Sequence, residues 1–270
     1  MKTCSKLSFV LASVMLISSV LYAYMKESNI AAKNYYNIME SGVLRVVVEQ
    51  NNMSYSVNDD STIVGLQYKM IEELAEDWKL SIHYIKVSDL GAAIDMLNNN
   101  EVDLLAWHIP IHVEMEENLA FTIPVFTSRQ VLVQRKKSTT GIVRNQLDLA
   151  KQTIHIPKDS PYKQRIQNLA KEIGDTIYIE EINDIQLDSL FNKIAKGEIN
   201  FTVCEQIVAN VEKQQYPSLD TETAISFKQN YGWAVRQEST VLKDSLDGWL
   251  NVFLQSKEYN RMYRKYTKLK

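Results

Sequence analysis

Two segments of the chain repeat one plan, and each ends in a side chain that could hold a charged ligand. Residues 94–108 and residues 191–205 each combine a helix, a polar turn, a Glu, an apolar residue, Asp or Asn, and a short buried strand. Aligning the Glu that follows each turn places His108 opposite Glu205, at the ends of equivalent strands. Because ligands of open α/β sheets bind beyond the carboxyl ends of the strands, we expect two similar lobes with a cleft between them.

The same residue types argue against several other kinds of chemistry. Cys4 and Cys204 are the only cysteines, so the sequence predicts neither a disulfide framework nor a cysteine-based metal site. His108 and His112 are four residues apart, but Pro110 between them prevents helical pairing toward a metal. Thirty Lys and Arg against 33 Asp and Glu give a net charge of -3, which provides no basic surface for nucleic acid. We therefore expect no metal, no cofactor and no nucleic-acid partner.

The elements that must position these side chains alternate between strand and helix. With 270 residues and 45% hydrophobic composition, the chain is long enough for two lobes of about 100 residues each. The alternation predicts an α/β protein whose mixed or parallel sheets are covered by helices. Strands are expected at 42–50, 82–87, 102–109, 131–135, 153–156, 177–179 and 199–204, and helices at 65–80, 90–97, 161–173, 187–195 and 241–268.

The first 24 residues have the pattern of an export segment. Residues 1–6 carry two lysines, and residues 7–24 carry no charge. A basic start followed by an apolar run is typical of a secretory signal, and this run is also long enough to remain as a membrane anchor. We interpret residues 1–23 as a signal peptide or membrane anchor and residues 24–40 as a connector. The protein is expected in the periplasm, secreted or tethered to the membrane.

Several short motifs then occur in a characteristic order. They are GVLRV at 42–46, IVGL at 63–66, MIEELA at 70–75, LNNNEVDLLA at 97–106, FTIPVF at 121–126, QVLV at 130–133, KGEIN at 196–200 and YGWAVR at 231–236. Together they resemble the bacterial extracellular solute-binding proteins of family 3. The resemblance implies the two-lobe periplasmic-binding-protein fold of type II, with lobe 1 at 41–127 plus 231–270, lobe 2 at 128–230, and two hinge strands. It also implies a monomer that closes on a small polar ligand.

One position departs from the pattern of the amino-acid binders in that family. There, an Arg after the third strand holds the ligand carboxylate in a two-bonded fork. Counting back from FTIPVF, the Arg position falls on Met115 and the Thr before it on His112. A thioether cannot form such a fork, so we expect a ligand other than a simple α-amino acid.

In the second lobe the resemblance assigns ligand contacts to Glu205 and Ser160. Glu205 falls where an acid receives a ligand ammonium; the alternative is an exposed Glu at a strand end. Ser160 falls where a hydroxyl at a helix start holds a carboxylate. Ser160 followed by Pro161 also has the pattern of a plain helix cap, and the sequence leaves both roles open.

In the first lobe the candidates follow two strands. Glu49, Asn52 and Tyr55 lie at and after the end of the first strand, where family members often contact the ligand. Trp107 and His108 end the third strand; Trp107 either stacks on a ligand or fills the hinge region. We expect none of these residues to be catalytic.

The sequence leaves three functions open. The first is capture of a solute for an ABC permease or for sensing. The second is a stand-alone regulatory module that senses cell-wall fragments or amino acids and acts with a peptidoglycan-processing enzyme. Residues 65–68 and 216–220 resemble the solute-binding module of the membrane-bound lytic murein transglycosylase F family, and the chain stops where the catalytic domain of that family would begin. The third is a dehydratase-like enzyme on the same scaffold. The first is preferred, and the protein is expected not to be an enzyme.

Overall fold

The structure is a computed structural model that describes residues 18, 34–58, 60–137 and 141–267. The expected signal or anchor at 1–23 therefore lies outside the described residues except for Ser18, as do residues 24–33 of the connector. Residues 34–41 form a helix. Among the described residues, no helix has both the length and the apolar character needed to cross a membrane.

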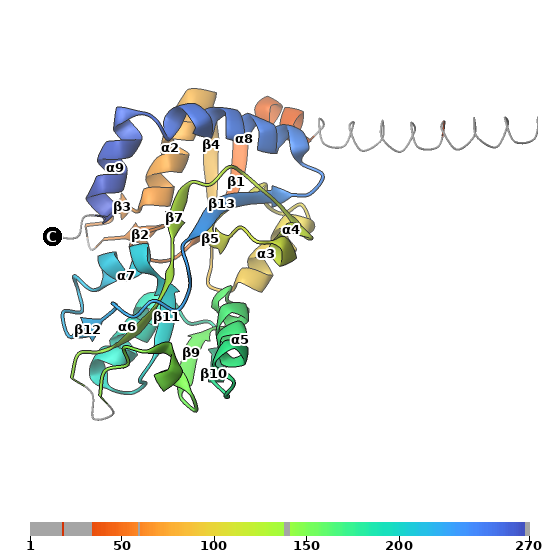
Figure 1. The fold of residues 1–270 in the computed structure, drawn as a ribbon. Helices are drawn as coiled ribbons and strands as arrows, with labels where there is room; N and C mark the ends of the chain where they lie inside the picture. The colour runs from red at the N-terminus through yellow and green to blue at the C-terminus, as the bar shows by residue number, and fades with distance from the viewer. Residues whose placement is uncertain (1–17, 19–33, 59, 138–140, 268–270) are drawn as a thin grey trace, which may run out of the picture.

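The first lobe is built on a six-stranded sheet (Figure 1). Its path is β4-β1-β5-β13-β6, with β7 also paired to β13; β1 is parallel to β4 and β5, while β13 is antiparallel to β5, β6 and β7. The strands are β1 (Val43–Glu49), β4 (Ser81–Val87), β5 (Leu104–Pro110), β6 (Leu119–Phe121), β7 (Phe126–Ser128) and β13 (Gln229–Arg236). The helices are α2 (Leu66–Trp78), α3 (Leu90–Asn98), α4 (Val113–Glu116), α8 (Thr240–Phe253) and α9 (Lys257–Thr267).

Strand β1 shows why this sheet is buried on both faces. Val46 and Val48 belong to the larger apolar cluster, which also contains the buried positions of α2 and α8. Val47, on the opposite face, packs in a separate cluster with Leu90 and Leu97 of α3. The unbroken β-branched run is therefore the pattern of a strand covered by helices on both sides.

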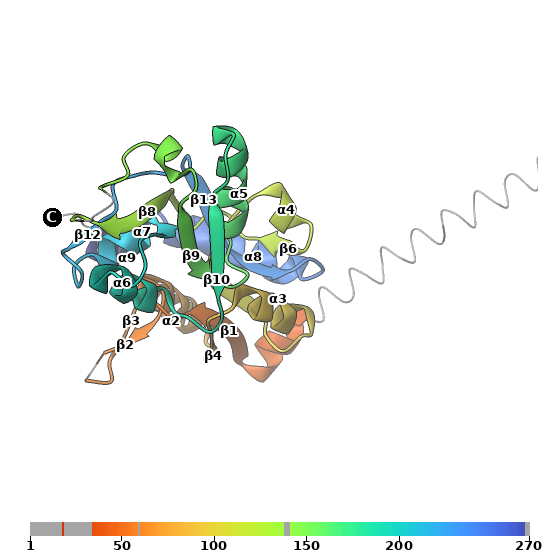
Figure 2. The ribbon, with the colours of Figure 1, turned by 90° about the horizontal axis from the view of Figure 1, so that it is seen from below.

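The short strands β2 (Ser56–Val57) and β3 (Ile63–Val64) pair with each other in the first lobe. The second lobe contains β8 to β12 and α5 to α7. Strand β9 (Thr153–Pro157) is parallel to β10 (Tyr178–Ile182), and β8 (Gln130–Arg135) is antiparallel to β11 (Thr202–Glu205) and β12 (Leu219–Asp220). The helices are α5 (Tyr162–Ile173), α6 (Leu187–Lys196), α7 (Gln206–Glu212) and the 3-10 turn η1 (Gln146–Leu149). Helices α5 and α6 lie on opposite sides of β9 and β10 (Figures 1 and 2).

The chain crosses between the lobes at β7–β8 and again on the way to β13 (Figure 1). Arg129 lies at the first crossing. Its carbonyl accepts from the Gln206 N–H at 2.8 Å, and its Nε donates to Gln206 Oε1 at 3.0 Å. At the second crossing, Ser226 Oγ accepts from the Gln130 N–H at 2.8 Å. Hydrogen bonds thus join both crossing segments to the second lobe.

The continuous tail helix expected at 241–268 is wrong in one respect. The structure has two helices, α8 and α9, separated by residues 254–256. The break occurs because Ser256 Oγ accepts from the Tyr259 N–H at 3.0 Å and so starts a new helix. The apolar spacing continues through the break, which is why periodicity alone did not reveal it.

A tight turn joins α2 to the loop that follows β1. Gly65 has φ of 135°, and a Cβ built on it would lie 2.0 Å from the Ser54 carbonyl oxygen. The Leu66 N–H donates to the Met53 carbonyl at 2.6 Å, and the Gly65 N–H donates to the Tyr266 hydroxyl of α9 at 2.9 Å. Only glycine can adopt this conformation at so close an approach.

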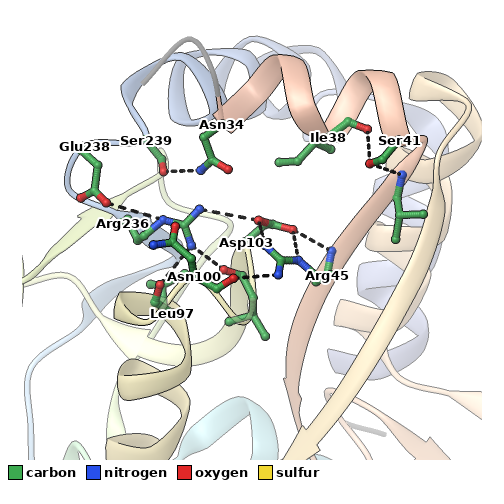
Figure 3. A network of polar contacts seen from close by, with 12 residues as sticks. Asn34, Ile38, Ser41, Arg45, Leu97, Asn100, Asp103, Arg236, Glu238 and Ser239 are labelled. Atoms are coloured by element: carbon green, nitrogen blue, oxygen red, sulfur yellow. Dashed lines mark hydrogen bonds and ion pairs between the residues drawn. The ribbon is translucent and has the colours of Figure 1, made fainter. Parts of the chain in front are cut away.

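A buried ion network lies at the start of β5, at the opposite end of the strands from His108 (Figure 3). Arg45 binds Asp103 through two parallel bonds of 2.9 and 2.7 Å. Arg236, 2% exposed, lies 3.6 Å from the same carboxylate and donates to the carbonyls of Leu97 and Val102. We call Arg45, Asp103 and Arg236 the distal network.

Candidate ligand-binding site

Four ionisable side chains meet between the lobes where the strands end. Glu49 ends β1, and its Oε2 lies 2.7 Å from Nδ1 of His108 on β5. Glu205 ends β11, and its Oε2 accepts from the hydroxyl of Tyr162, the first residue of α5, at 2.6 Å. We call these four residues the cleft cluster. Glu205 and His108 interact electrostatically, so the cluster joins the two lobes.

Burial brings the pKa of Glu205, one of the two acids of the cleft cluster, close to neutral pH. Glu205 is fully buried, which raises its pKa; His108 lowers it, Glu49 raises it, and the Tyr162 hydrogen bond lowers it, with a result of about 7. Burial lowers the pKa of His108, but the hydrogen bond and charge of Glu49 and the charge of Glu205 outweigh burial and raise it overall. The cluster can therefore gain or lose a proton with small changes of surroundings.

Two polar atoms of the cleft cluster have no hydrogen-bond partner within the described part of the chain. They are His108 Nε2 and Glu205 Oε1, and both are buried. An unpaired buried polar group costs about 1–3 kcal/mol, more when it is charged, so such atoms are rare where nothing binds. The arrangement offers a donor or acceptor on His108 and an acceptor on Glu205 to a small molecule.

A small cavity lies beside the cluster. Its free volume is about 20 Å³, room for about one water molecule. It is lined from the first lobe by Glu49 and Trp107 and from the second by Lys158, Ser160 and Tyr162. The lobes are thus close together, and the site between them has polar side chains but little free volume.

Side chains bond the lobes to each other directly. Asn52 donates from its backbone N and from Nδ2 to the two carboxylate oxygens of Glu212 at 3.2 and 3.1 Å. Gln186 Nε2 donates to Gln50 Oε1 at 2.8 Å. These contacts connect the loop after β1 with α7 and with the start of α6.

The structure gathers most of the residues singled out from the sequence. Glu49, Trp107 and Ser160 line the small cavity, and His108 and Glu205 adjoin it. Ser160 also caps α5, because its Oγ accepts from the Tyr162 N–H at 3.1 Å. Glu205 is not an exposed strand-end residue.

The other four residues lie elsewhere. Asn52 and Tyr55 line a second hollow next to the cavity, and the Tyr55 ring packs edge-on against Tyr68. His112 and Met115 line neither space; Met115 packs against the apolar cluster beneath α3. The position where the resemblance places a carboxylate-binding Arg is therefore a methionine that lines neither space.

Sequence reasoning missed four residues at the lobe interface: Gln50, Tyr162, Gln186 and Glu212. Gln50, Gln186 and Glu212 bond across the gap between the lobes. Tyr162 lines the cavity and binds Glu205, and no local pattern marks any of these contacts. Within the part of the chain that the structure describes, no group of three or more His, Cys, Asp or Glu is placed to hold a metal ion.

The fold and the cleft define the class of protein. Among solved structures, an ancestral arginine-binding protein bound to arginine is similar with a TM-score of 0.73 and 19% identity, covering 84% of this chain and 99% of that one. A solute receptor for L-cysteine of Neisseria gonorrhoeae gives 0.74 and 15%, covering 86% and 92%. The chain has the two-lobe α/β fold of type II periplasmic binding proteins.

The sequence places it within that class. The chain belongs to the bacterial extracellular solute-binding proteins, family 3, whose model matches residues 44–269. It is 22% identical over 234 residues to the membrane-bound lytic murein transglycosylase F of Desulfosudis oleivorans, covering 87% of this chain and 50% of that protein. The chain spans about half the length of the curated relatives it matches.

Proposed function

We propose that this protein captures a small polar ligand bearing a cationic group in the cleft between its lobes. The observation that carries the proposal is Glu205, a fully buried carboxylate whose Oε1 has no hydrogen-bond partner among the described residues. Glu49 adds a second acid on the facing lobe. A ligand ammonium would bond the unpaired oxygen and offset the charge that burial makes costly.

Selectivity for a cation follows from which charges surround the cavity. Two proteins of similar structure are an arginine-binding protein and a solute receptor for L-cysteine. Here the fork position is Met115, which packs away from the cavity. Lys158 lines the cavity but is half exposed, and it lies 3.8 Å from Asp159. Glu49 and Glu205 carry more negative charge than the single, solvent-screened Lys158 offsets. The cavity therefore favours a ligand that bears an amine over a ligand whose only charge is a carboxylate.

Lobe closure supplies the mechanism of capture. The contacts of Asn52 with Glu212 and of Gln186 with Gln50 bond the two lobes to each other. A ligand that bridges Glu49 and Glu205 adds to the same closed state and shifts the population toward it. We place the lobes at 41–127 plus 231–270 and at 128–230. The protein then acts as an exported monomer, periplasmic, secreted or tethered, that serves an ABC permease or a sensor and has no catalytic role.

A second function is favoured by one observation. The relative from Desulfosudis oleivorans is a lytic transglycosylase that matches along 87% of this chain. A regulatory module that senses cell-wall fragments or amino acids beside a peptidoglycan-processing enzyme would use the same cleft. Incubation of the purified protein with peptidoglycan should release no muropeptides by chromatography. Addition of the protein to a lytic enzyme from the same cell should change the rate of that enzyme if the regulatory role is correct.

Calorimetry at pH 8 tests the proposed capture of a cation. The panel contains L-arginine, L-lysine and pentylamine as amines, and succinate and glutarate as acids. Amines should bind, and Glu205→Gln should weaken them by about 100-fold or more, because it removes a desolvated charge partner. Glu198→Gln is the matched control, since Glu198 is an exposed acid of the same lobe that pairs with Lys193 at 3.0 Å. Binding of the acids alone, or equal affinity in the Glu205→Gln variant, would contradict the proposal.

A further inference from the structure

Two further buried polar atoms lie beside Glu205, on the strands that follow the two crossings between the lobes. Gln130 is the first residue of β8, and Tyr231 lies in β13 (Figure 1). Gln130 is 1% exposed and Tyr231 is fully buried. Neither Gln130 Oε1 nor the Tyr231 hydroxyl has a hydrogen-bond partner among the described residues. The hinge side of the cleft therefore contains polar atoms that the protein itself leaves unpaired.

Strand pairing and electrostatics bring both side chains next to Glu205. Gln130 is directly opposite Glu205 in the antiparallel pair of β8 and β11, so both side chains leave the sheet on one face, with Cβ atoms about 4.5–5.5 Å apart. Burial raises the pKa of the Tyr231 hydroxyl, the charge of Glu205 raises it further, and the Gln130 side chain lowers it. The hydroxyl is thus close to both residues, although it forms no hydrogen bond of normal geometry with either.

Aromatic packing fixes the position of the Tyr231 ring. It stacks on Phe126 of β7, its neighbour across the strand pair, with ring centroids 5.1 Å apart and planes 10° from parallel. The Phe126 ring in turn contacts the His108 ring edge-on at 5.4 Å. Because the ring is held in this stack, the Tyr231 hydroxyl cannot turn toward solvent to find a partner there.

The three unpaired oxygens have the chemistry to receive hydrogen bonds. An amide oxygen and an ionised carboxylate oxygen only accept, and a phenol oxygen accepts as well as donates. A buried acceptor without a donor costs about 1–3 kcal/mol, so a ligand group with several N–H bonds is favoured here. A primary ammonium carries three N–H bonds, one for each of Glu205 Oε1, Gln130 Oε1 and the Tyr231 hydroxyl. A quaternary ammonium has the same charge and no N–H bond.

We infer that Gln130 and Tyr231 determine specificity by completing, with Glu205, a three-acceptor site for a primary ammonium group. This rests on the proposed function, because the ammonium is the one that Glu205 captures. His108 Nδ1 is bonded to Glu49, which offsets the positive charge that the imidazole gains on protonation. Each methyl group that replaces an N–H leaves one buried acceptor unpaired, so the site selects against N-methylated amines. Tyr231 belongs to the first lobe and the other two acceptors to the second, so the ammonium also bridges the lobes.

Calorimetry at pH 8 with pentylamine, N-methylpentylamine and N,N,N-trimethylpentylammonium tests the three-acceptor site. The probes share one charge and one alkyl chain and carry three, two and no N–H bonds. Wild-type protein should bind pentylamine about tenfold or more tightly than the trimethyl cation, with N-methylpentylamine between them.

Two variants separate hydrogen bonding from the size of the methyl groups. Tyr231→Phe removes only the hydroxyl and keeps the ring that stacks on Phe126, and Gln130→Met keeps the length of the side chain without its amide. Each should weaken pentylamine about tenfold and N-methylpentylamine less, so that the ratio of the two affinities falls toward one. Tyr178→Phe is the matched control, because Tyr178 is an exposed tyrosine of the second lobe, and it should keep the wild-type ratio. Urea unfolding of each variant verifies that it is folded.

The outcomes separate this inference from the proposed function. If pentylamine binds through Glu205 and the trimethyl cation binds equally well, the three-acceptor site is wrong and cation capture remains correct. The same holds if Tyr231→Phe and Gln130→Met both keep the wild-type ratio of affinities. If none of the three cations binds the wild-type protein, both the proposed function and the three-acceptor site are wrong.

Discussion

Strands β1 and β5 carry a group of buried charges at each end, and the two groups differ in how completely their charges are paired. In the distal network, Asp103 lies between two arginines and makes two bonds of 2.9 and 2.7 Å with Arg45. In the cleft cluster, His108 lies between Glu49 and Glu205, and one polar atom on each of His108 and Glu205 has no partner among the described residues.

The contrast separates a structural group from a candidate binding group within one sheet. Each group contains buried charged side chains, Asp103 and Arg236 in one and His108 and Glu205 in the other, so burial alone does not distinguish them. In the distal network both oxygens of Asp103 are bonded by Arg45, and Arg236 donates from Nη1 to two backbone carbonyls, while its Nη2 has only the 3.6 Å contact with Asp103. The cleft cluster leaves an acid with a pKa of about 7 and an unused oxygen. An acid with an unused oxygen, which Glu205 has and Asp103 has not, points to a site that something else completes.

The largest expected effect is on the distal network. Asp103→Asn leaves Arg236 buried without its acid, and removal of one partner from a buried pair costs about 3–5 kcal/mol. Urea unfolding at pH 7 measures this loss in the free energy of unfolding. Glu238→Gln is the control, because Glu238 is half exposed and 3.7 Å from Arg236, and it should cost less than about 1 kcal/mol. A loss below about 1 kcal/mol for Asp103→Asn would show that the network does not stabilise the fold.

In the cleft cluster, removal of the charge of Glu205 should instead increase the free energy of unfolding at high pH. The folded-state pKa of Glu205 is raised from 4.5 to about 7, so the folded protein holds its proton more tightly than the unfolded chain does. That contribution is fully present below about pH 4.5 and is lost as the pH rises through 7. Glu205→Gln, which cannot ionise, should therefore be more stable than wild type at pH 8, on the order of 2 kcal/mol.

Urea unfolding of wild type and Glu205→Gln between pH 4 and pH 8 checks this sign. The difference between the two proteins should grow with pH, while Glu198→Gln should follow wild type. A Glu205→Gln variant that is less stable than wild type at pH 8 would show that the carboxylate is paired like Asp103, and the comparison would fail.

Amine binding should depend on pH through the same carboxylate. An ammonium prefers ionised Glu205, whose pKa is about 7, so affinity should rise about tenfold between pH 6 and pH 8. Because His108 lowers the pKa of Glu205, His108→Gln should move the midpoint of this rise to higher pH. Calorimetric titrations across this range measure both effects. A pH-independent affinity would exclude Glu205 as the group that titrates.

The smallest expected effect is that of Arg45→Lys. The Arg45 side chain is 36% exposed, so solvent screens its charge, and lysine keeps the charge but loses the two parallel bonds to Asp103. We expect a loss of about 1 kcal/mol by urea unfolding and unchanged amine affinity by calorimetry. A change in amine affinity would mean that the two ends of the strands are coupled.

The sequence predicted the elements whose signals are local and missed others, among them β13 and α7. The β-branched run of β1 and the helical spacing of α2 appear within single segments, and the internal repeat placed His108 and Glu205 at equivalent strand ends. Asp103 shows the limit. The backbone N–H that Asp103 accepts from belongs to Arg45, 58 residues away, and its main partners are guanidinium groups, so no local pattern marks these contacts.

The interface contacts could not be predicted for a related reason. Asn52 and Glu212 are 160 residues apart, and Gln50 and Gln186 are 136 apart. Each pair meets only when the two lobes have folded and closed, so neither residue carries a local pattern that announces the other. The break between α8 and α9 depends on a single serine hydroxyl, which periodicity does not detect.

Gly65 limits how this protein can diverge in evolution. Its φ of 135° and the 2.0 Å approach to Ser54 exclude any side chain while the loop after β1 keeps its path. That loop carries Asn51 and Asn52, which line the second hollow next to the cavity. In a homologous sequence where any other residue replaces this glycine, the loop must run differently and the hollow must change shape. The residue at this position thus separates homologues that kept this loop and hollow from those that remodelled them.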